Sequence, residues 1–166
     1  MTLNQALINE LQLEAASTRK MLEAVPDDKF DWKPHEKSMT LRRLATHVAE
    51  LANWPEMIVN KEELNLAEMN YNPTPVATTQ DLLDMHERNV SRSVAVLQEA
   101  PEDRLMEMWT LRKGEHIIFQ MPKAAVLRGM CYNHTYHHRG QLSVFLRLLD
   151  VKVPGIYGPS YDDNNN

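Results

Sequence analysis

Four stretches of the chain repeat apolar residues at the spacing of an amphipathic helix and have no proline in their interior. Leu3, Leu7 and Leu11 would share one face of the first stretch, and Leu41, Leu44, Val48 and Leu51 would do so in the second. Apolar positions three or four residues apart line one side of a helix, so this pattern predicts four long helices. We place them at about residues 3–25, 40–54, 79–100 and 122–149.

Residues that favour helix ends mark the same stretches. Ser38 or Thr40 can cap the second helix, and Thr78 or Thr79 can cap the third, because their hydroxyl groups accept hydrogen bonds from the free backbone N–H groups of the first turn. Pro55 should end or kink the second helix. These signals support the boundaries that the apolar pattern predicts.

The connection between the third and fourth helices allows two interpretations. Residues 108–111 and 117–119 look like two short strands around a turn at Gly114, and a long irregular crossover is the alternative. We find no internal repeat and no linker between domains. The fold class that we expect is therefore all-α, a four-helix bundle with a long crossover connection, in a single domain spanning residues 1–166.

Composition narrows the class of protein further. The 166 residues carry 18 basic and 23 acidic side chains, for a net charge of −5, which argues against a nucleic-acid partner bound through a broad basic surface. A single cysteine excludes an intrachain disulfide framework. No segment approaches ~18 consecutive apolar residues, so no contact with a membrane is expected, and the N-terminus lacks the features of a signal peptide. We expect a cytoplasmic protein with a small-molecule substrate.

The candidate chemistry lies among seven histidines. His134 and His138 are four residues apart in the fourth predicted helix, so their side chains would lie one above the other on the same face. That face is also the apolar one, and two imidazoles at this spacing can bind one metal ion. A surface pair, or two hydrogen-bonded histidines in the core, is the alternative.

Spacing alone does not choose a third ligand. His47 is three residues after Leu44, and His86 is three residues after Leu83, so either could point inward. His137 would project about 100° away from His138 around the helix. It is therefore expected to face solvent or an interface.

Three segments resemble the DinB (DinB/YfiT-like) family, whose members are metalloenzymes or of unassigned function. Residues 133–142, NHTYHHRGQL, match the family's HxxxHRGQ signature; residues 41–47, LRRLATH, resemble its second-helix segment, and residues 153–160, VPGIYGPS, its usual ending. The resemblance covers essentially the whole chain. It implies a four-helix bundle in which three histidines hold one divalent metal ion, here His47, His134 and His138. It also implies a homodimer.

The resemblance further implies a range of activities. Members with assigned activity are metal-dependent transferases that use a low-molecular-weight thiol (bacillithiol, mycothiol or glutathione), or a thiol-dependent maleylpyruvate isomerase. The leading hypothesis is therefore a thiol S-transferase with zinc or nickel as its cofactor and the thiol as cosubstrate. A metal-dependent hydrolase and a non-catalytic metal-binding stress-response module are the alternatives. A carboxylate base near the metal would favour the hydrolase. A pocket large enough for a thiol would favour the transferase, and a closed four-coordinate site would favour the structural module.

Several residues near the predicted ligands could support the site or the helix packing. Gln141, three residues after His138, could hydrogen-bond a ligand imidazole, and Glu50, three residues after His47, could act as a general base, although an exposed glutamate is the alternative. We expect Cys131 to pack as a small apolar residue. Gly129 and Gly140 lie inside the fourth predicted helix, where close approach of a neighbouring helix would explain them.

Overall fold

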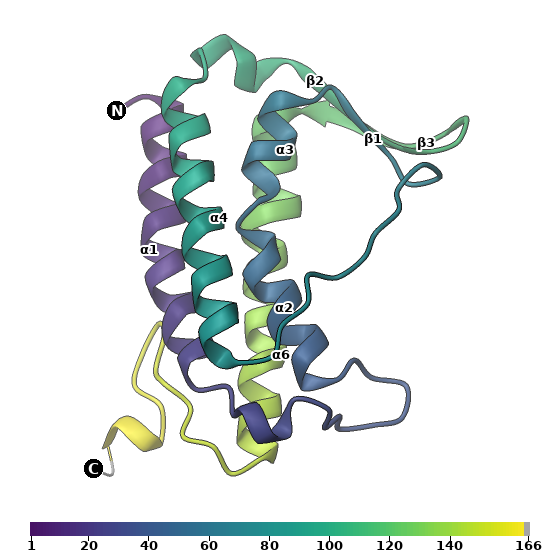
Figure 1. Cartoon of the computed structure of the whole chain (residues 1–166). Coiled ribbons are helices and arrows are strands. Elements are labelled where there is room, and N and C mark those ends of the chain that lie inside the picture. The colour runs from purple at the N-terminus through teal and green to yellow at the C-terminus, as the bar shows by residue number, and fades with distance from the viewer. Residues whose placement is uncertain (165–166) are drawn as a thin grey trace.

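The structure is a computed structural model that describes residues 1–164, all but the last two of the predicted domain. Long helices run side by side, and a small sheet extends from one end of them (Figure 1). The helices are α1 (Leu3–Glu23), α2 (Leu41–Leu51), α3 (Trp54–Asn60), α4 (Thr79–Glu99), α5 (Lys123–Val126) and α6 (His134–Leu148). The strands are β1 (Glu63–Asn65), β2 (Met108–Lys113) and β3 (His116–Pro122). Short 3₁₀ turns occupy Asp27–Lys29, Glu102–Met106 and Asp162–Asn164.

Threonine side chains cap two of the helices that build the site. The Thr40 hydroxyl accepts a hydrogen bond from the backbone N–H of Arg43, 3.2 Å away, and so begins α2. Thr78 and Asp81 form a reciprocal capping box at the start of α4. In each case the cap is one of the two residues that the sequence allowed.

The second predicted helix ends earlier than expected, and a further helix follows it. The chain turns at Ala52 and Asn53, and α3 then begins at Trp54 with Pro55 in its first turn. Proline fits the first turn of a helix because the N–H that it lacks would have no partner there. Pro55 therefore marks a beginning as well as an end, and the sequence pattern missed α3.

The fourth predicted helix is helical throughout, but its hydrogen bonding changes along its length. It consists of α5, a π-helical segment at Leu127–Asn133, and α6. His134 and His138 lie together on α6, and Gly140 does not interrupt that helix. A Cβ atom added at Gly129 or Gly140 would meet nothing within 4 Å, so close approach of a helix within this chain is the wrong explanation for the two glycines.

The sheet corrects the all-α expectation. Strands β2 and β3 form the antiparallel hairpin that was one of the two interpretations of this region, with Gly114 at a φ of +60° in its turn. Strand β1 then pairs in parallel with β2, Leu64 opposite Leu111. Only three residues long, β1 carries too little alternation to be recognised, and its partner lies far along the chain. The protein is thus mostly helical with a small three-stranded sheet.

Two apolar clusters hold the helices together. One of them joins α2 to α6 through Leu44, Val48, Leu142 and Leu146, each of which is fully buried. The second lies toward the sheet and surrounds Trp109. No helix within residues 1–164 combines the length and the apolar composition that crossing a membrane requires. The packing of α2 on α6 is what brings His47 to the histidine pair.

Candidate metal centre

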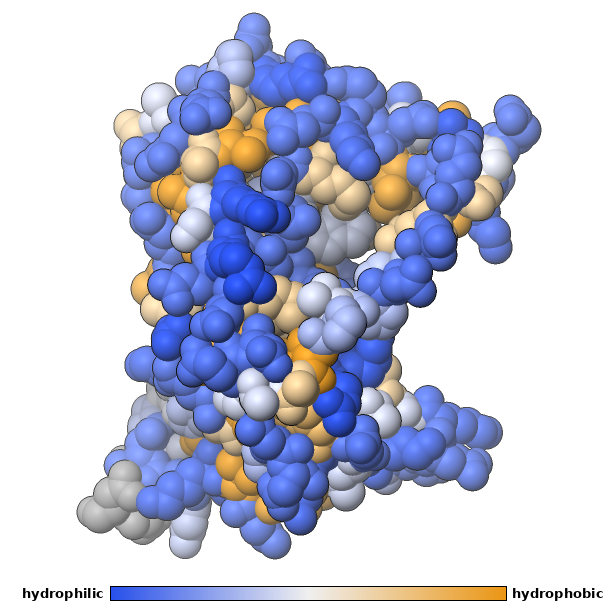
Figure 2. Space-filling view, in the orientation of Figure 1, coloured by the Kyte–Doolittle hydropathy of each residue, from blue (hydrophilic) through white to orange (hydrophobic). Residues whose placement is uncertain are grey.

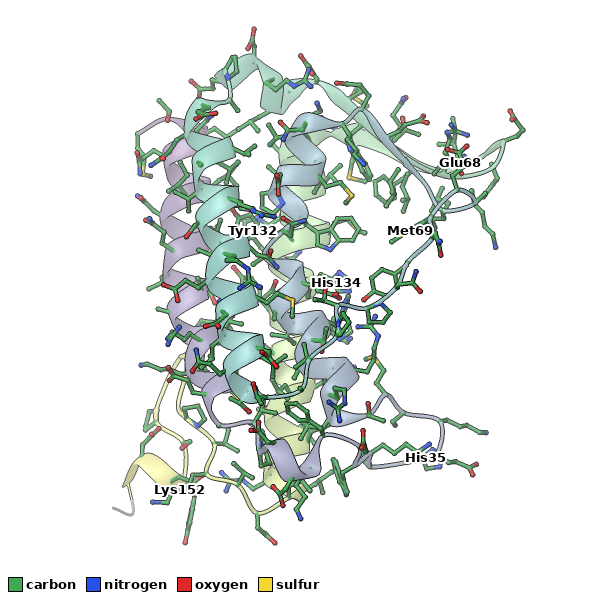
Figure 3. All side chains as sticks on the ribbon, in the orientation of Figure 1. His35, Glu68, Met69, Tyr132, His134 and Lys152 are labelled. Atoms are coloured by element: carbon green, nitrogen blue, oxygen red, sulfur yellow. The ribbon has the colours of Figure 1, made fainter. Side chains whose placement is uncertain are left out.

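Two of the three histidines come from one turn of α6. His134 is the first residue of this helix and His138 follows four residues later, so their side chains leave it on the same side. Their Nε2 atoms lie 2.9 Å apart. In Figure 3, His134 lies about midway along the bundle beside α2. The pair therefore faces the neighbouring helix, as the apolar pattern indicated.

The third histidine comes from α2. His47 precedes the fully buried Val48 and is itself partly buried. Its Nε2 atom lies 3.4 Å from Nε2 of His134, and its ring centroid lies 4.5 Å from that of His138. One nitrogen atom from each of the three rings lies within 4.8 Å of the others. The fold thus joins two distant segments of the chain into one cluster.

Gln141 fixes which nitrogen of His138 carries the proton. The Nδ1 atom of His138 is 2.8 Å from Oε1 of Gln141. An amide oxygen can only accept, so Nδ1 must be the donor and the proton lies on that side of the ring. The Nε2 atom of His138 is then left with its lone pair, which points toward the other two histidines.

The surroundings also keep the three rings uncharged. Burial, followed by the nearby His138 and His134, lowers the pKa of His47 to about 4. Burial is likewise the main cause that lowers the pKa of His134 and of His138. At neutral pH all three are therefore neutral imidazoles, which is the form that binds a metal ion.

These residues fit a divalent transition-metal ion. The three rings bring nitrogen atoms within 4.8 Å of one another, and the lowered pKa values disfavour a second, charging proton on any of them, so a cation between the rings suits the cluster. Neutral imidazole is a common ligand of zinc, nickel, copper and iron. Among residues 1–164, the group holds no fourth histidine, cysteine or carboxylate. The cluster could therefore bind one such ion and leave coordination positions free.

A large cavity adjoins the cluster. Its volume is about 550 Å³, within the range of cavities that hold small molecules. Figure 2 shows the hollow beside the loop that carries Met69, which Figure 3 labels. His47 lines the cavity, whereas His134 and His138 do not. A molecule in this cavity would therefore reach the cluster at His47.

Glu50 also lines the cavity, but its carboxylate is occupied. Oε2 accepts a hydrogen bond from the Tyr71 hydroxyl at 2.5 Å, and Oε1 accepts from the backbone and the hydroxyl of Thr74, both at 3.1 Å. Arg43 lies 3.8 Å from Oε2. Glu50 thus fastens the loop before α4 to α2, and a substrate proton would compete with three hydrogen bonds that this carboxylate already accepts.

The remaining histidines lie apart from the cluster. His86 is buried, with Nε2 3.2 Å from the carbonyl oxygen of Ala15 on α1, which removes it as a rival to His47. His137 is exposed and does not join the group, although its ring centroid is 4.8 Å from that of His138. Cys131 is buried, and burial raises its thiol pKa to about 12, so this thiol is protonated at neutral pH.

The arginine of the HxxxHRGQ segment has a different environment from its histidines. Arg139 is buried and forms an ion pair with Glu14 of α1 at 2.6 Å. The hydroxyl of Tyr157 lies 2.5 Å from Arg139 and 2.8 Å from the Glu14 carboxylate. Tyr157 is not among the residues that line the cavity. These contacts tie the segment after α6 to the bundle and do not contribute to the cluster.

The sequence did not indicate several residues that line the cavity. Trp54 and Met57 belong to α3, which the pattern missed, and Met69 and Tyr71 lie in an irregular loop. Arg88 and Arg92 are exposed residues of α4 that no sequence motif marked. Their spacing of four residues places them on one side of that helix, but only the fold shows that α2 and α3 face the same side.

Comparisons with known proteins agree with the geometry. The model of the DinB family matches residues 1–165. The chain is 28% identical over 156 residues to the uncharacterized protein YrdA of Bacillus subtilis, covering 92% of this chain and 86% of YrdA.

Solved structures share the fold. A DinB-like protein from Bacillus cereus superposes with a TM-score of 0.71 at 23% identity, covering 92% of this chain and 97% of the other. The DinB-like protein YjoA of Bacillus subtilis gives a TM-score of 0.70 at 18% identity, covering 91% and 97%. Because the model of the DinB family matches residues 1–165, nearly the whole chain, this protein belongs to the DinB family.

Proposed function

We propose that this protein is a metal-dependent transferase that activates a low-molecular-weight thiol at His47, His134 and His138. The observation that carries the proposal is the convergence of three neutral imidazoles, with no fourth protein ligand among the described residues, next to a cavity of about 550 Å³. A structural metal site is usually closed by four protein ligands, whereas a site with three leaves room for a reactant.

The residues of the cluster and of the cavity would have different roles in this reaction. The three histidines would hold one divalent ion, with zinc or nickel suited to imidazole ligands. Such an ion acts as a Lewis acid and lowers the pKa of a thiol that binds it. Gln141 keeps His138 in the tautomer and orientation that a ligand needs, and the cavity beside His47 would hold the reactants.

The reaction that we propose is the alkylation or arylation of the thiol. The S–H proton leaves to solvent, the sulfur atom forms a bond to an electrophilic carbon, and the leaving group departs with the electrons of its own bond. The thiol belongs to the cosubstrate. Cys131 is not the nucleophile, because its thiol is buried and protonated.

The environment of Glu50 favours this reaction over hydrolysis. A hydrolase benefits from a general base that takes a proton from the attacking water. Glu50 is the only carboxylate among the described residues that line the cavity, and it accepts hydrogen bonds from Tyr71 and Thr74. A thiol needs no such base once its pKa is lowered.

A thiol-conjugation screen tests the proposal. Protein loaded with zinc or nickel is incubated with glutathione, bacillithiol or mycothiol and a panel of electrophiles that includes a chlorodinitrobenzene and a bimane, and loss of free thiol is followed. We expect conjugation above the uncatalysed rate, lost in His134→Ala and retained in His137→Ala. Consumption of electrophiles without loss of thiol would instead assign a hydrolase. No turnover of any kind would favour a non-catalytic metal-binding module.

A further inference from the structure

The cavity beside His47 carries positive charge on a protein whose net charge is −5. Three arginines line it, Arg43 from α2 and Arg88 and Arg92 from α4, against one glutamate. Glu50 is itself 3.8 Å from Arg43 and already accepts three hydrogen bonds. The cavity therefore has an excess of positive charge that the protein does not neutralise.

Two of these arginines are free to bind a ligand. Arg88 and Arg92 are one turn apart on α4 and are exposed, and neither has a hydrogen bond or an ion pair with another residue in the described part of the chain. Most of the other arginines are paired, as Arg19, Arg112 and Arg147 illustrate. A guanidinium group presents several N–H donors in one plane, which suits carboxylate and phosphate oxygens.

Two residues that line the cavity each carry a buried polar atom without a hydrogen bond, although one of these atoms, on Arg43, keeps its 3.8 Å ion pair with Glu50. Nη1 of Arg43 and Oδ1 of Asn53 are buried and make no hydrogen bond. Buried polar atoms without a partner are uncommon in folded proteins, and a bound ligand is one of the ways in which they are satisfied. Trp54 and Met57 of α3 add an apolar surface to the same cavity.

From this arrangement we propose that the cavity binds a small organic anion. Its carboxylate or phosphate group is held by Arg88 and Arg92, and its apolar part packs against Trp54 and Met57. The inference rests on the proposed function in one respect, since it assigns an anionic group to one of the two reactants. Charge of this kind would also draw the substrate toward His47.

Binding to the metal-free protein tests this inference without any chemistry at the histidines. Isothermal titration calorimetry would compare phenylpropionate with phenylpropionamide, which has a similar shape but no charge, and with phenethyl phosphate as the phosphate arm. We expect the amide to bind at least tenfold more weakly than one of the anions. The anion that binds more tightly identifies the class of anion.

Three variants show which residues are responsible. Arg88→Gln and Arg92→Gln should each weaken binding of the preferred anion about tenfold, since a hydrogen bond to a charged group contributes on this scale, and should leave amide binding unchanged. Lys113→Gln removes the same charge at an exposed position outside the cavity and should have no effect. Circular dichroism of all three variants checks that the helices are retained.

The outcomes separate this inference from the proposed function. Equal binding of the acid and the amide, no binding of any probe, or an equal loss in Lys113→Gln would overturn the anion site. Anion binding together with failure of the thiol-conjugation screen would overturn only the transferase. Conjugation of thiols without any preference for anions would support the proposed transferase activity and overturn the proposed anion site.

Discussion

At the scale of single residues, the three clustered histidines differ from the exposed histidine beside them. His47, His134 and His138 bring one nitrogen atom each to a common place and have lowered pKa values. His137 is exposed and contributes no nitrogen atom to that group, although its ring lies against His138. Two neighbouring residues of the same type therefore have different environments. This contrast gives a matched control for any experiment on metal binding.

Alanine substitutions test the cluster directly. We expect the native protein to bind one divalent ion per chain, and His47→Ala, His134→Ala and His138→Ala each to bind much less, because two imidazoles hold such an ion far more weakly than three. The helices should remain, since a core of this size does not need a metal to fold. Elemental analysis of the purified variants measures the effect. Equal loss of metal in His137→Ala, or full loading in His47→Ala, would show that the three ligands are assigned wrongly.

The hydrogen bond from His138 to Gln141 leads us to expect a smaller effect on metal affinity. Removing the acceptor in Gln141→Ala should weaken metal binding roughly 10–100-fold while leaving all three ligands in place, as loss of a group that orients a ligand histidine typically does. Competition with a chromophoric chelator measures the affinity. Ser143→Ala is the control, because its hydroxyl bonds only the backbone of α6. An unchanged affinity in Gln141→Ala would mean that the ring is held by packing alone.

At the scale of elements, the helix that carries the histidine pair contains a glycine without a structural role in the single chain. Gly140 lies inside α6, and an added Cβ would meet nothing within 4 Å. Gly114, by contrast, has a φ of +60° in the turn between β2 and β3. The same substitution should therefore have opposite effects at the two positions.

Gly140→Ala should raise the free energy of unfolding by about 1 kcal/mol, because alanine loses less backbone entropy in a helix. Gly114→Ala should lower it by about 1–2 kcal/mol, because a Cβ clashes in the left-handed region. Urea denaturation of the two variants measures both values. Destabilisation by Gly140→Ala would indicate that a surface outside the single chain, such as a second copy, packs on this face of α6.

At the scale of the whole molecule, the sequence predicted the long elements well and the short ones poorly. Apolar spacing placed α1, α2, α4 and the helical stretch from α5 to α6 to within a few residues, and threonine caps supported the starts of α2 and α4. Long helices repeat their signal over several turns, so local pattern is enough to find them. β1 and α3 are too short to repeat a pattern, and β1 depends on a partner far along the chain.

In the candidate site, too, the sequence predicted the residues with a local pattern and missed those that only the fold brings together. The pair His134 and His138 follows from local spacing, and the resemblance to the DinB family singled out His47, which spacing alone could not separate from His86. The cavity was not predictable, because Arg88 and Trp54 meet only through the packing of α3 and α4. Nor could the sequence show that Glu50 accepts a hydrogen bond from Tyr71, since Tyr71 lies in an irregular loop whose path has no local pattern.

The homodimer that the resemblance implies stays a prediction. The chain has ten methionines, whose flexible side chains suit an adaptable apolar contact surface. Light scattering at micromolar concentration should give twice the chain mass of 19.2 kDa. A clean monomer would remove the dimer without affecting the proposed metal site, because all three candidate ligands come from one chain.

Acid should destabilise the metal-free protein through its clustered histidines. The pKa of His47 is about 4 in the folded chain against an ordinary value of 6.5, and those of His134 and His138 are also lowered. Between these values the unfolded chain takes up protons that the folded chain does not, so the free energy of unfolding falls as the pH drops from 6.5 toward 4. The carboxylates with lowered pKa values, such as Asp81 and Asp162, titrate below this window.

Urea denaturation of the metal-free protein across this pH range measures the effect, with His47→Gln as the matched variant. Glutamine does not titrate, so the variant should lose less stability than the native protein over the same range, while the part that His134 and His138 contribute should remain. Parallel curves for the two proteins would mean that His47 is as accessible to protons in the folded chain as in the unfolded one. In that case burial would not be what keeps this imidazole ready to bind a metal ion at neutral pH.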